Sequence, residues 1–342
     1  MMLSKLSIAK IWLALLGLAF LVSCSDAPEK ISFSGKTMGT TYSVTVYSKD
    51  PRHNKEEIQK KVDIVLKRVN AQMSTYDPES ELSQFNQFKS TQPMVISRDL
   101  ERVVNRGLEI AEETEGALDI TVGPLVNLWG FGPQARPEKE PSEEELNAVR
   151  EKTGYQKLRV ENHQLIKDNP DLYVDLSTIA KGFGVDRVAH LLDQLRIKQY
   201  LVEIGGEVIA KGGKPDEALW RLAIEKPVST ERAVQRVVQF KDGALATSGD
   251  YRNYYEEDGK RYSHIIDPVT GAPVQHNLVS TSVYAEDTMS ADAYATALFV
   301  MGTEKAKSFA KKHNMAVMLI YKTDDGFEEY MSEAFKPLLA EQ

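Results

Sequence analysis

The chain contains a single cysteine, Cys24, among its 342 residues. One cysteine excludes an intramolecular disulfide and a metal site built from cysteines, so packing alone must stabilise the fold. Basic residues are also in the minority. The formal net charge is −8, and no basic stripe of the kind that binds a nucleic-acid backbone is present. We therefore expect no nucleic-acid partner.

A long hydrophobic run is missing as well. The apolar stretch 11–22 is short for a bilayer span and follows Lys5 and Lys10, which is typical of a secretory signal. It ends in Leu21-Val22-Ser23-Cys24, a pattern that resembles a bacterial lipobox, in which the signal is cut before an acylated cysteine. An uncleaved membrane anchor and a buried thiol are the alternatives.

These signals predict three segments. They are a lipoprotein signal peptide over 1–23, a lipidated Cys24 with a polar tether over 24–34, and one domain over 35–342. The lipid would hold that domain at the cell membrane on its periplasmic side. Ser25 follows Cys24 and Asp26 comes one residue later, which leaves the choice of membrane open, with the inner membrane favoured over the outer.

The overall composition is that of an ordinary globular protein, with 42% hydrophobic and 27% charged residues. Apolar residues at helical spacing predict helices over 54–73, 97–116, 142–154, 289–300 and 303–313. Alternating or continuous apolar runs predict strands over 42–47, 200–208, 220–227, 234–240 and 316–321. Helices and strands mix without strict βαβ alternation, so we predict a single α+β domain with a largely antiparallel sheet and packed helices.

The run VDLSTIAKGFGVDRV, residues 174–188, reads as a buried strand over 173–176 that opens through small residues into a helix. Such a helix start presents free backbone amides and a positive dipole end, which attract anions. Lys181 adds a charge, while Gly182 and Gly184 allow close approach of a phosphate. The alternative is a purely structural turn.

A second candidate site is the helix predicted within 289–302, because Asp292 and Thr296 are four residues apart and share a face. A carboxylate and a hydroxyl together suit a hard cation such as Mg²⁺, which commonly bridges a protein carboxylate and substrate phosphates. Alternatively, Asp292 is a residue of the helix start and Thr296 lies at the edge of the core.

Three segments could contact a flat ring system. The run 116–132 combines glycines with Trp129 and Phe131, Tyr76 follows a predicted helix near a turn, and Met38 is a soft side chain beside a glycine. Alternatively, the run 116–132 is an irregular segment that crosses the core, and Tyr76 packs against the sheet. His264 lies in a polar, turn-rich segment and is the candidate general base, with a structural histidine as the alternative.

Six motifs occur in one order: KTMGT, GALDITVGPLVNLWGFG, DLSTIAKG, ATSGDYRNYY, SHIIDPVTG and the pair Asp292 and Thr296. Together with the lipobox, they closely resemble the ApbE-type FAD:protein FMN transferases over nearly the whole mature chain. The resemblance implies a T-fold-like α+β domain that binds FAD, uses Mg²⁺ and transfers FMN to a threonine hydroxyl of another protein, with release of AMP.

The resemblance also implies site residues. FAD contacts would fall on Met38, Tyr76, Ala117, Leu118, Asp119, Asp175, Lys181 and the backbone of Ile266. The metal ligands would be Thr178, through its carbonyl, Asp292 and Thr296. Ser177 and Thr178 replace the smaller residues often found in the family, so the metal geometry is least defined there.

The implied partners are FAD, the membrane through the lipid anchor, and acceptor proteins of membrane-linked electron-transfer complexes that carry a threonine flavinylation motif. Two other functions fit the same residues. One is an FAD pyrophosphatase, in which water replaces the threonine, and the other is a non-catalytic periplasmic lipoprotein that carries flavin.

Overall fold

The structure is a computed structural model that describes residues 27–132, 140–227, 233–250, 254–257 and 260–341. The predicted signal peptide, Cys24 and residues 251–253 of the ATSGDYRNYY motif lie outside the described residues. None of the helices in the described ranges has both the length and the apolar character that crossing a membrane requires.

An antiparallel sheet of eight strands forms the centre of the molecule, in the order β1-β2-β6-β7-β10-β15-β16-β17. Its strands are β1 (Glu29–Thr37), β2 (Thr40–Ser48), β6 (Gln199–Ile204), β7 (Glu207–Lys211), β10 (Gly243–Gly249), β15 (Leu278–Ala285), β16 (Ala316–Thr323) and β17 (Gly326–Met331). The prediction of an α+β domain with a largely antiparallel sheet is confirmed.

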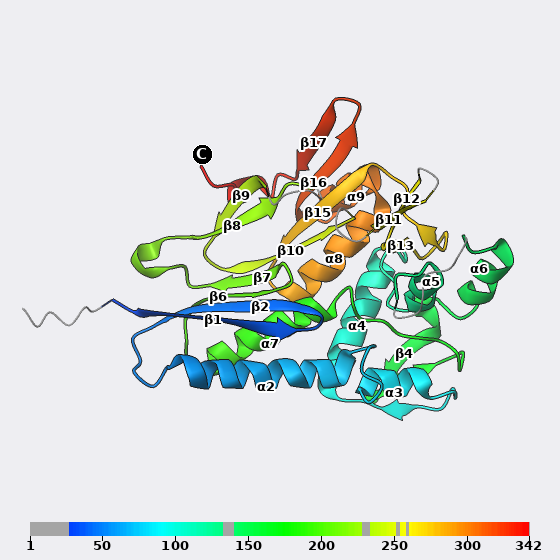
Figure 1. Ribbon diagram of the computed structural model, residues 1–342, viewed down its shortest axis with the longest axis horizontal. Helices are drawn as coiled ribbons and strands as arrows, with labels where there is room; N and C mark the ends of the chain where they lie inside the picture. Colours follow the sequence, from blue (N-terminus) through cyan, green and yellow to red (C-terminus); the bar gives the residue numbers. More distant parts are fainter. Residues whose placement is uncertain (1–26, 133–139, 228–232, 251–253, 258–259, 342) are drawn as a thin grey trace, which may run out of the picture.

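Helices cover one face of this sheet, and a hairpin covers part of the other (Figure 1). The helices are α2 (Lys55–Met73), α7 (Ala180–Gln194), α8 (Thr288–Met301) and α9 (Thr303–Lys312), and the hairpin strands are β8 (Trp220–Glu225) and β9 (Val234–Phe240). Helix α8 packs on α7, β10 and β15. It fits there because the small residues Ala291, Ala293, Ala295 and Ala297 are fully buried.

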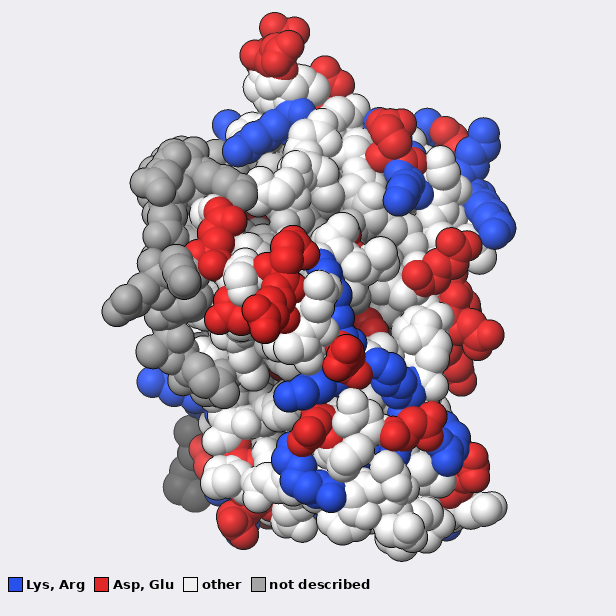
Figure 2. All heavy atoms as spheres, turned by 90° about the vertical axis from the view of Figure 1, so that its right-hand side faces the viewer, with Lys and Arg blue, Asp and Glu red and all other residues white. Residues whose placement is uncertain are grey.

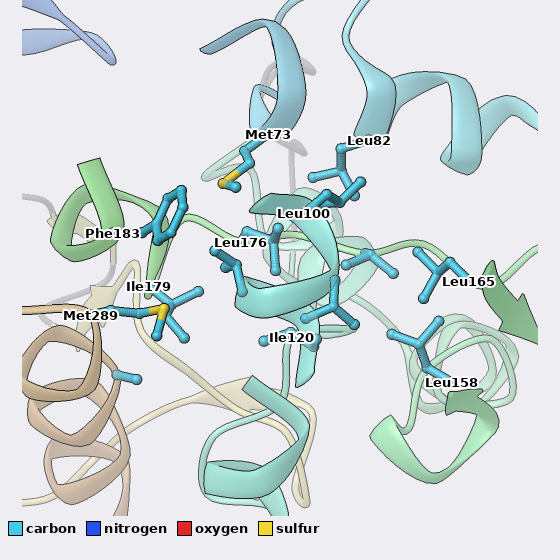
Figure 3. Close-up of a cluster of buried hydrophobic side chains, with 14 of the residues drawn as sticks. Met73, Leu82, Leu100, Ile120, Leu158, Leu165, Leu176, Ile179, Phe183 and Met289 are labelled. Carbon is cyan, nitrogen blue, oxygen red and sulfur yellow. The ribbon is translucent and has the colours of Figure 1, made fainter. Parts of the chain in front are cut away.

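Residues 74–132 and 140–179 form a lobe inserted between β2 and β6 in the sequence. Its elements are α3 (Glu81–Gln87), β3 (Met94–Val95), α4 (Arg98–Glu113), α5 (Gly123–Leu128), α6 (Glu143–Arg150), β4 (Leu158–Glu161) and β5 (Gln164–Lys167). Figure 3 shows the apolar cluster that joins this lobe to the sheet helices, with Met73, Leu100, Leu176, Phe183 and Met289 pointing toward one another.

Short strands complete the fold on the side of α5 and α6 (Figure 1). They are β11 (Tyr254–Glu257), β12 (Lys260–Ser263), β13 (Ile266–Asp267) and β14 (Ala272–Pro273). Figure 2 shows acidic and basic side chains interspersed on this side of the molecule, without a continuous basic stripe.

The predicted helices all form, and their starts are capped as the sequence suggests. The side chains of Asn54, Ser97 and Ser142 each accept a backbone hydrogen bond in the first helical turn, and Ser142 with Glu145 makes a complete capping box. The helix expected to reach Gly154 ends at Arg150 instead.

Two predictions about extended segments are wrong. Residues 29–34, taken as part of the tether, belong to β1, where Ile31 and Phe33 are buried against α2 and α7 while Lys30, Ser32 and Ser34, which alternate with them, are exposed. The domain therefore begins before residue 35.

The strand predicted over 173–176 does not pair with another strand. Instead, the side chain of Asn86 accepts a hydrogen bond from Val174 N at 2.8 Å and donates one to Val174 O at 2.9 Å. A buried amide side chain thus satisfies the backbone groups that a neighbouring strand would have paired.

Candidate active site

A cavity of about 440 Å³ opens between the inserted lobe, the start of α7, the middle of α8 and the β12–β13 segment. It is lined by Tyr76, Ala117, Leu118, Asp119, Asp175, Thr178, Lys181, His264, Ile266, Asp292 and Thr296. Of the FAD and metal residues that the resemblance implies, all except Met38 lie on its wall, together with His264, and Met38 lines an adjoining groove. Four segments far apart in the sequence therefore form one site.

The docking of α7 against α8 sets the geometry at the floor of the cavity. Asp186 on α7 accepts hydrogen bonds from the first backbone amides of α8, Thr288 N and Met289 N, each at 2.9 Å. Burial raises the pKa of Asp186 to about 6, although these two donors pull it down. The carboxylate lies at the positive end of α8, so it also complements the helix dipole.

One turn further along α8, Asp292 faces the first turn of α7. Its Oδ2 accepts a hydrogen bond from Gly182 N at 3.0 Å, and its Oδ1 lies 3.6 Å from Lys181 Nζ. Asp292 is only 3% exposed, and this burial raises its pKa in spite of the nearby lysine. The phosphate-loop helix and the helix bearing Asp292 are thus in direct contact, as a ligand bridging the two requires.

Lys181 has a second and closer carboxylate partner. Glu207, the first residue of β7, places its Oε1 2.6 Å from Lys181 Nζ and is 3% exposed. Burial lowers the pKa of a lysine, but the charges of Asp292 and Glu207 outweigh it and raise the pKa of Lys181. The ammonium is therefore fully charged at neutral pH.

The expectation of free amides at the start of α7 needs correction. Gly182 N is used by Asp292, and Ala180 N donates to Leu176 O at 2.7 Å. The ammonium of Lys181 is likewise shared between two carboxylates. Ala180 N, Gly182 N and the Lys181 ammonium thus already have carboxylate or carbonyl partners.

Oxygen atoms from three elements could hold a cation here. Thr296 Oγ1 lies 3.0 Å from Ser248 Oγ, one turn beyond Asp292 on α8. Thr178 Oγ1 is buried and has no hydrogen-bond partner among the described residues. Buried oxygens without partners are uncommon, and carboxylate and hydroxyl oxygens are donors that fit a hard cation such as Mg²⁺.

The donors do not resemble a transition-metal site. Within the described ranges, no group of three or more histidine, cysteine, aspartate or glutamate side chains could hold a metal ion. A cation at this position would therefore depend on hydroxyl, carbonyl and water oxygens as well as on Asp292, which is the coordination that Mg²⁺ usually keeps.

Met38 and Tyr76 lie at the outer end of the site. A groove lined by Met38, Gly39 and Met73 shares Tyr76, Asp175 and Lys181 with the cavity, so the two spaces are continuous. Met38 and Gly39 form the two-residue turn between β1 and β2 with positive φ angles of 49° and 70°. Tyr76 is 74% exposed, which leaves its ring free to cover a flat ligand.

The segment 117–119 has mixed roles. Leu118 is 1% exposed and belongs to the core of the inserted lobe. The carboxylate of Asp119 accepts hydrogen bonds from Thr121 N and Thr121 Oγ1, both at 2.7 Å, and from Tyr155 N at 3.0 Å. Burial raises its pKa despite these donors. The Asp119 side chain therefore holds the shape of the wall that this segment contributes to the cavity.

His264 and Ile266 contribute another part of the cavity wall. The imidazole of His264 is half-buried and meets the ring of Phe131 edge-on, with centroids 6.4 Å apart. Trp129 supports this wall from behind, because its Nε1 donates to Gly271 O at 2.8 Å and its ring stacks on Tyr262. The run 116–132 is thus partly core and partly cavity wall, which combines the two interpretations left open by the sequence.

Sequence reasoning missed Glu207. The only local signal was its position directly after Gly205-Gly206, where an acidic residue starts an otherwise apolar strand. An acid at a buried strand position needs a partner, and the partner here is 26 residues away on α7.

Comparisons with known proteins identify the family. The model of the ApbE family matches residues 38–319. The FAD:protein FMN transferase of Vibrio cholerae serotype O1 is 51% identical over 330 residues, which cover 96% of this chain and 99% of the relative.

Solved structures give the same result. The flavin transferase ApbE from Vibrio cholerae superposes with a TM-score of 0.85 at 50% identity, covering 91% of this chain and all of that one. The flavinyl transferase ApbE of Pseudomonas stutzeri, in its apo form, gives a TM-score of 0.85 at 36% identity, with 93% and 99% covered. With a family match over most of its length and relatives this similar, the chain belongs to the ApbE family.

Proposed function

We infer that this chain is an FAD:protein FMN transferase, and we propose that the cavity described above carries out the transfer with Mg²⁺. The activity is the one named for relatives that align over nearly the full chain. The observation that supports the site is the direct contact between Lys181 and Gly182 on α7 and Asp292 on α8. A single diphosphate bound there could reach both helices.

In this proposal, the flavin ring lies in the groove beside Met38 and under Tyr76, and the diphosphate lies near Lys181. The cation ligands would be Asp292 and Thr296 from α8 and Thr178 from the turn before α7. A bound Mg²⁺ would neutralise the negative charge that develops on the transferred and leaving phosphates.

The reaction is a displacement at phosphorus. The Oγ of the acceptor threonine forms a bond to the phosphorus of the FMN half, the bond from that phosphorus to the bridging oxygen breaks, and AMP leaves with that oxygen. His264 takes the threonine proton, since it places an imidazole on the wall of the same cavity as Lys181. The residues of the wall hold FAD so that attack is in line, and the protein forms no covalent bond with it.

The central test is covalent flavinylation. We expect the protein, incubated with FAD, Mg²⁺ and an acceptor subunit, to add the mass of FMN to one acceptor threonine, as measured by mass spectrometry. The variant Asp292→Ala should lose the transfer almost completely, and EDTA should have the same effect on the unaltered protein. Undiminished transfer by Asp292→Ala would exclude the proposed cation site.

The same assay without acceptor distinguishes the other functions. A pyrophosphatase would release AMP from FAD rapidly when no acceptor is present, and a flavin carrier would leave FAD intact even with Mg²⁺ and acceptor. A transferase releases AMP in proportion to the acceptor modified.

The role of His264 needs a readout that separates binding from transfer. We expect His264→Ala to bind FAD within about threefold of the unaltered protein and to transfer FMN about 10²- to 10⁴-fold more slowly, the usual contribution of a general base. Transfer at the normal rate would remove His264 from the mechanism.

We also propose that Cys24 carries a lipid that holds the enzyme at the periplasmic side of the cell membrane. Of the two membranes, we favour the inner over the outer. The lipobox-like sequence supports the lipid anchor, and acceptors of membrane-linked electron-transfer complexes with a threonine motif would then be concentrated near the site. Incorporation of labelled fatty acid that is abolished by Cys24→Ser, together with membrane fractionation, tests the anchor.

A further inference from the structure

Glu207 is a buried acid in the cavity that the proposed reaction does not use. It starts β7 directly after the turn Gly205-Gly206, and its Oε2 lies back over Gly205, where an added Cβ would be 3.5 Å from it. Its Oε1 contacts Lys181 Nζ at 2.6 Å, and its Oε2 has no hydrogen-bond partner within the described part of the chain. The carboxylate is thus fixed against the one lysine on the cavity wall.

The charges at this end of the cavity are unbalanced. Two carboxylates, those of Glu207 and Asp292, share the single ammonium of Lys181, and both are 3% exposed. When both are ionised, the cluster carries one more negative than positive charge. Charges act on one another strongly where water is excluded, so this excess is felt across the cavity.

A diphosphate entering such a site meets repulsion. Lys181 would attract it, but the charge of that lysine is already compensated by Glu207 at a closer distance than by Asp292. A divalent cation bound at Asp292 reverses the sign of the whole cluster, because two positive charges exceed the one excess negative charge. Repulsion of the diphosphate then becomes attraction.

We propose that Glu207 makes the binding of FAD depend on prior binding of a divalent cation, by cancelling the charge of Lys181 until the cation is present. This rests on the proposed Mg²⁺ role of Asp292. Glu207 is in this view a positioning residue, since it acts through Lys181 and through its charge, without contact to the reacting phosphorus. By linkage, FAD should in turn strengthen cation binding by the same factor.

The test measures the equilibrium affinity for FAD with Mg²⁺ and with EDTA, by fluorescence of the flavin, without any acceptor. Burial and Asp292 raise the pKa of Glu207 to about 7 against the pull of Lys181. The measurement therefore belongs at about pH 8.5, where this carboxyl is ionised. We expect the unaltered protein to bind FAD at least about tenfold more weakly in EDTA than in Mg²⁺, an effect of ordinary size for coupled sites.

The variant Glu207→Gln should reduce this ratio to within about threefold, chiefly because binding in EDTA becomes tighter. Glu207→Ala removes the same charge and should act in the same direction, which covers the case that the glutamine variant folds poorly. The matched control is Glu203→Gln on β6. This residue belongs to the same hairpin, and its carboxylate accepts hydrogen bonds from Gly206 N and Ser43 Oγ, away from Lys181, so the ratio should remain unchanged.

Titration of Mg²⁺ into the FAD-free protein separates the two proposals. If Mg²⁺ binds and the ratio is the same in Glu207→Gln as in the unaltered protein, the inference about Glu207 is wrong and the cation site stands. If Mg²⁺ does not bind to the unaltered protein, or binds equally to Asp292→Ala, the cation site itself is wrong and the inference is overturned with it.

Discussion

Gly182 gives the sharpest prediction, because it lies where α7 meets the first turn of α8. A Cβ added at Gly182 would lie 2.3 Å from Thr288 O, 2.7 Å from Thr288 C and 2.8 Å from Met289 Cα. These are backbone atoms, and the hydrogen bonds from Thr288 N and Met289 N to Asp186 hold them in place. Gly182→Ala can therefore be accommodated only by moving α7 and α8 apart.

Two opposing terms set the size of the effect. Replacing glycine by alanine inside a helix favours folding by about 1 kcal/mol. Overpacking a well-filled contact costs about 1–3 kcal/mol, and overlap with backbone belongs at the upper end of that range or beyond. We expect Gly182→Ala to lower the free energy of unfolding by about 2 kcal/mol. The rate of FMN transfer should decrease by more than the loss of folded protein explains, because Gly182 N and Lys181 both contact Asp292.

Gly184→Ala is the matched control, because Gly184 lies two residues further along the same helix. Its added Cβ would meet Met38 Cε at 2.7 Å and Ile204 Cδ1 at 3.4 Å, the flexible ends of two side chains. Urea unfolding of both variants, with the transfer assay on each, checks the reasoning. We expect Gly184→Ala to be close to the unaltered protein or slightly more stable. If Gly182→Ala is as stable as Gly184→Ala, the close approach of the two helices is wrong.

Three further predictions concern the inserted lobe and the β12–β13 wall. Lys167 is fully buried and donates to Phe85 O and Leu172 O, and burial lowers its pKa to about 8. The unfolded chain then binds more protons above that pH, so the stability of the unaltered protein relative to Lys167→Met should rise by about 1–2 kcal/mol between pH 7 and about 9.5. Urea unfolding at the two pH values tests this, and an unchanged difference, as expected for exposed Lys60→Met, would contradict it. Asn86→Ala removes both hydrogen bonds to Val174 and should cost about 1–3 kcal/mol of unfolding free energy; a cost near that of a surface substitution would argue against this pairing. Trp129→Phe leaves Gly271 O without its donor and should weaken FAD binding and slow transfer. The expected loss is about 1–3 kcal/mol in the free energy of FAD binding. An unchanged FAD affinity, measured by titration, would show that this wall does not need the indole.

Much of the local structure could be predicted because its causes are local. The side chains of Asn54, Ser97 and Ser142 cap helices that begin at the next residue, and the spacing of Asp292 and Thr296 places both on the cavity side of α8. A cap or a helical face depends on residues within one or two turns, which the sequence shows directly. The order of the motifs likewise identified the family before any contact was known.

Only the tertiary structure determined the interactions whose two partners lie far apart in the chain. Val174 pairs with the side chain of Asn86, 88 residues away, so a segment that looks like a strand is not one. Gly182 N donates a hydrogen bond to Asp292, 110 residues away in the sequence. The segment predicted to bind phosphate through free amides is therefore in contact with a buried carboxylate. Glu207 joins that cluster only because the sheet places β7 beside α7.

The sequence by itself thus determined most of the helices and strands, the family and most of the candidate site residues, but not Glu207. Only the folded chain decided which of those charges neutralise one another, because the energy of a buried charge depends on distances that local sequence does not contain.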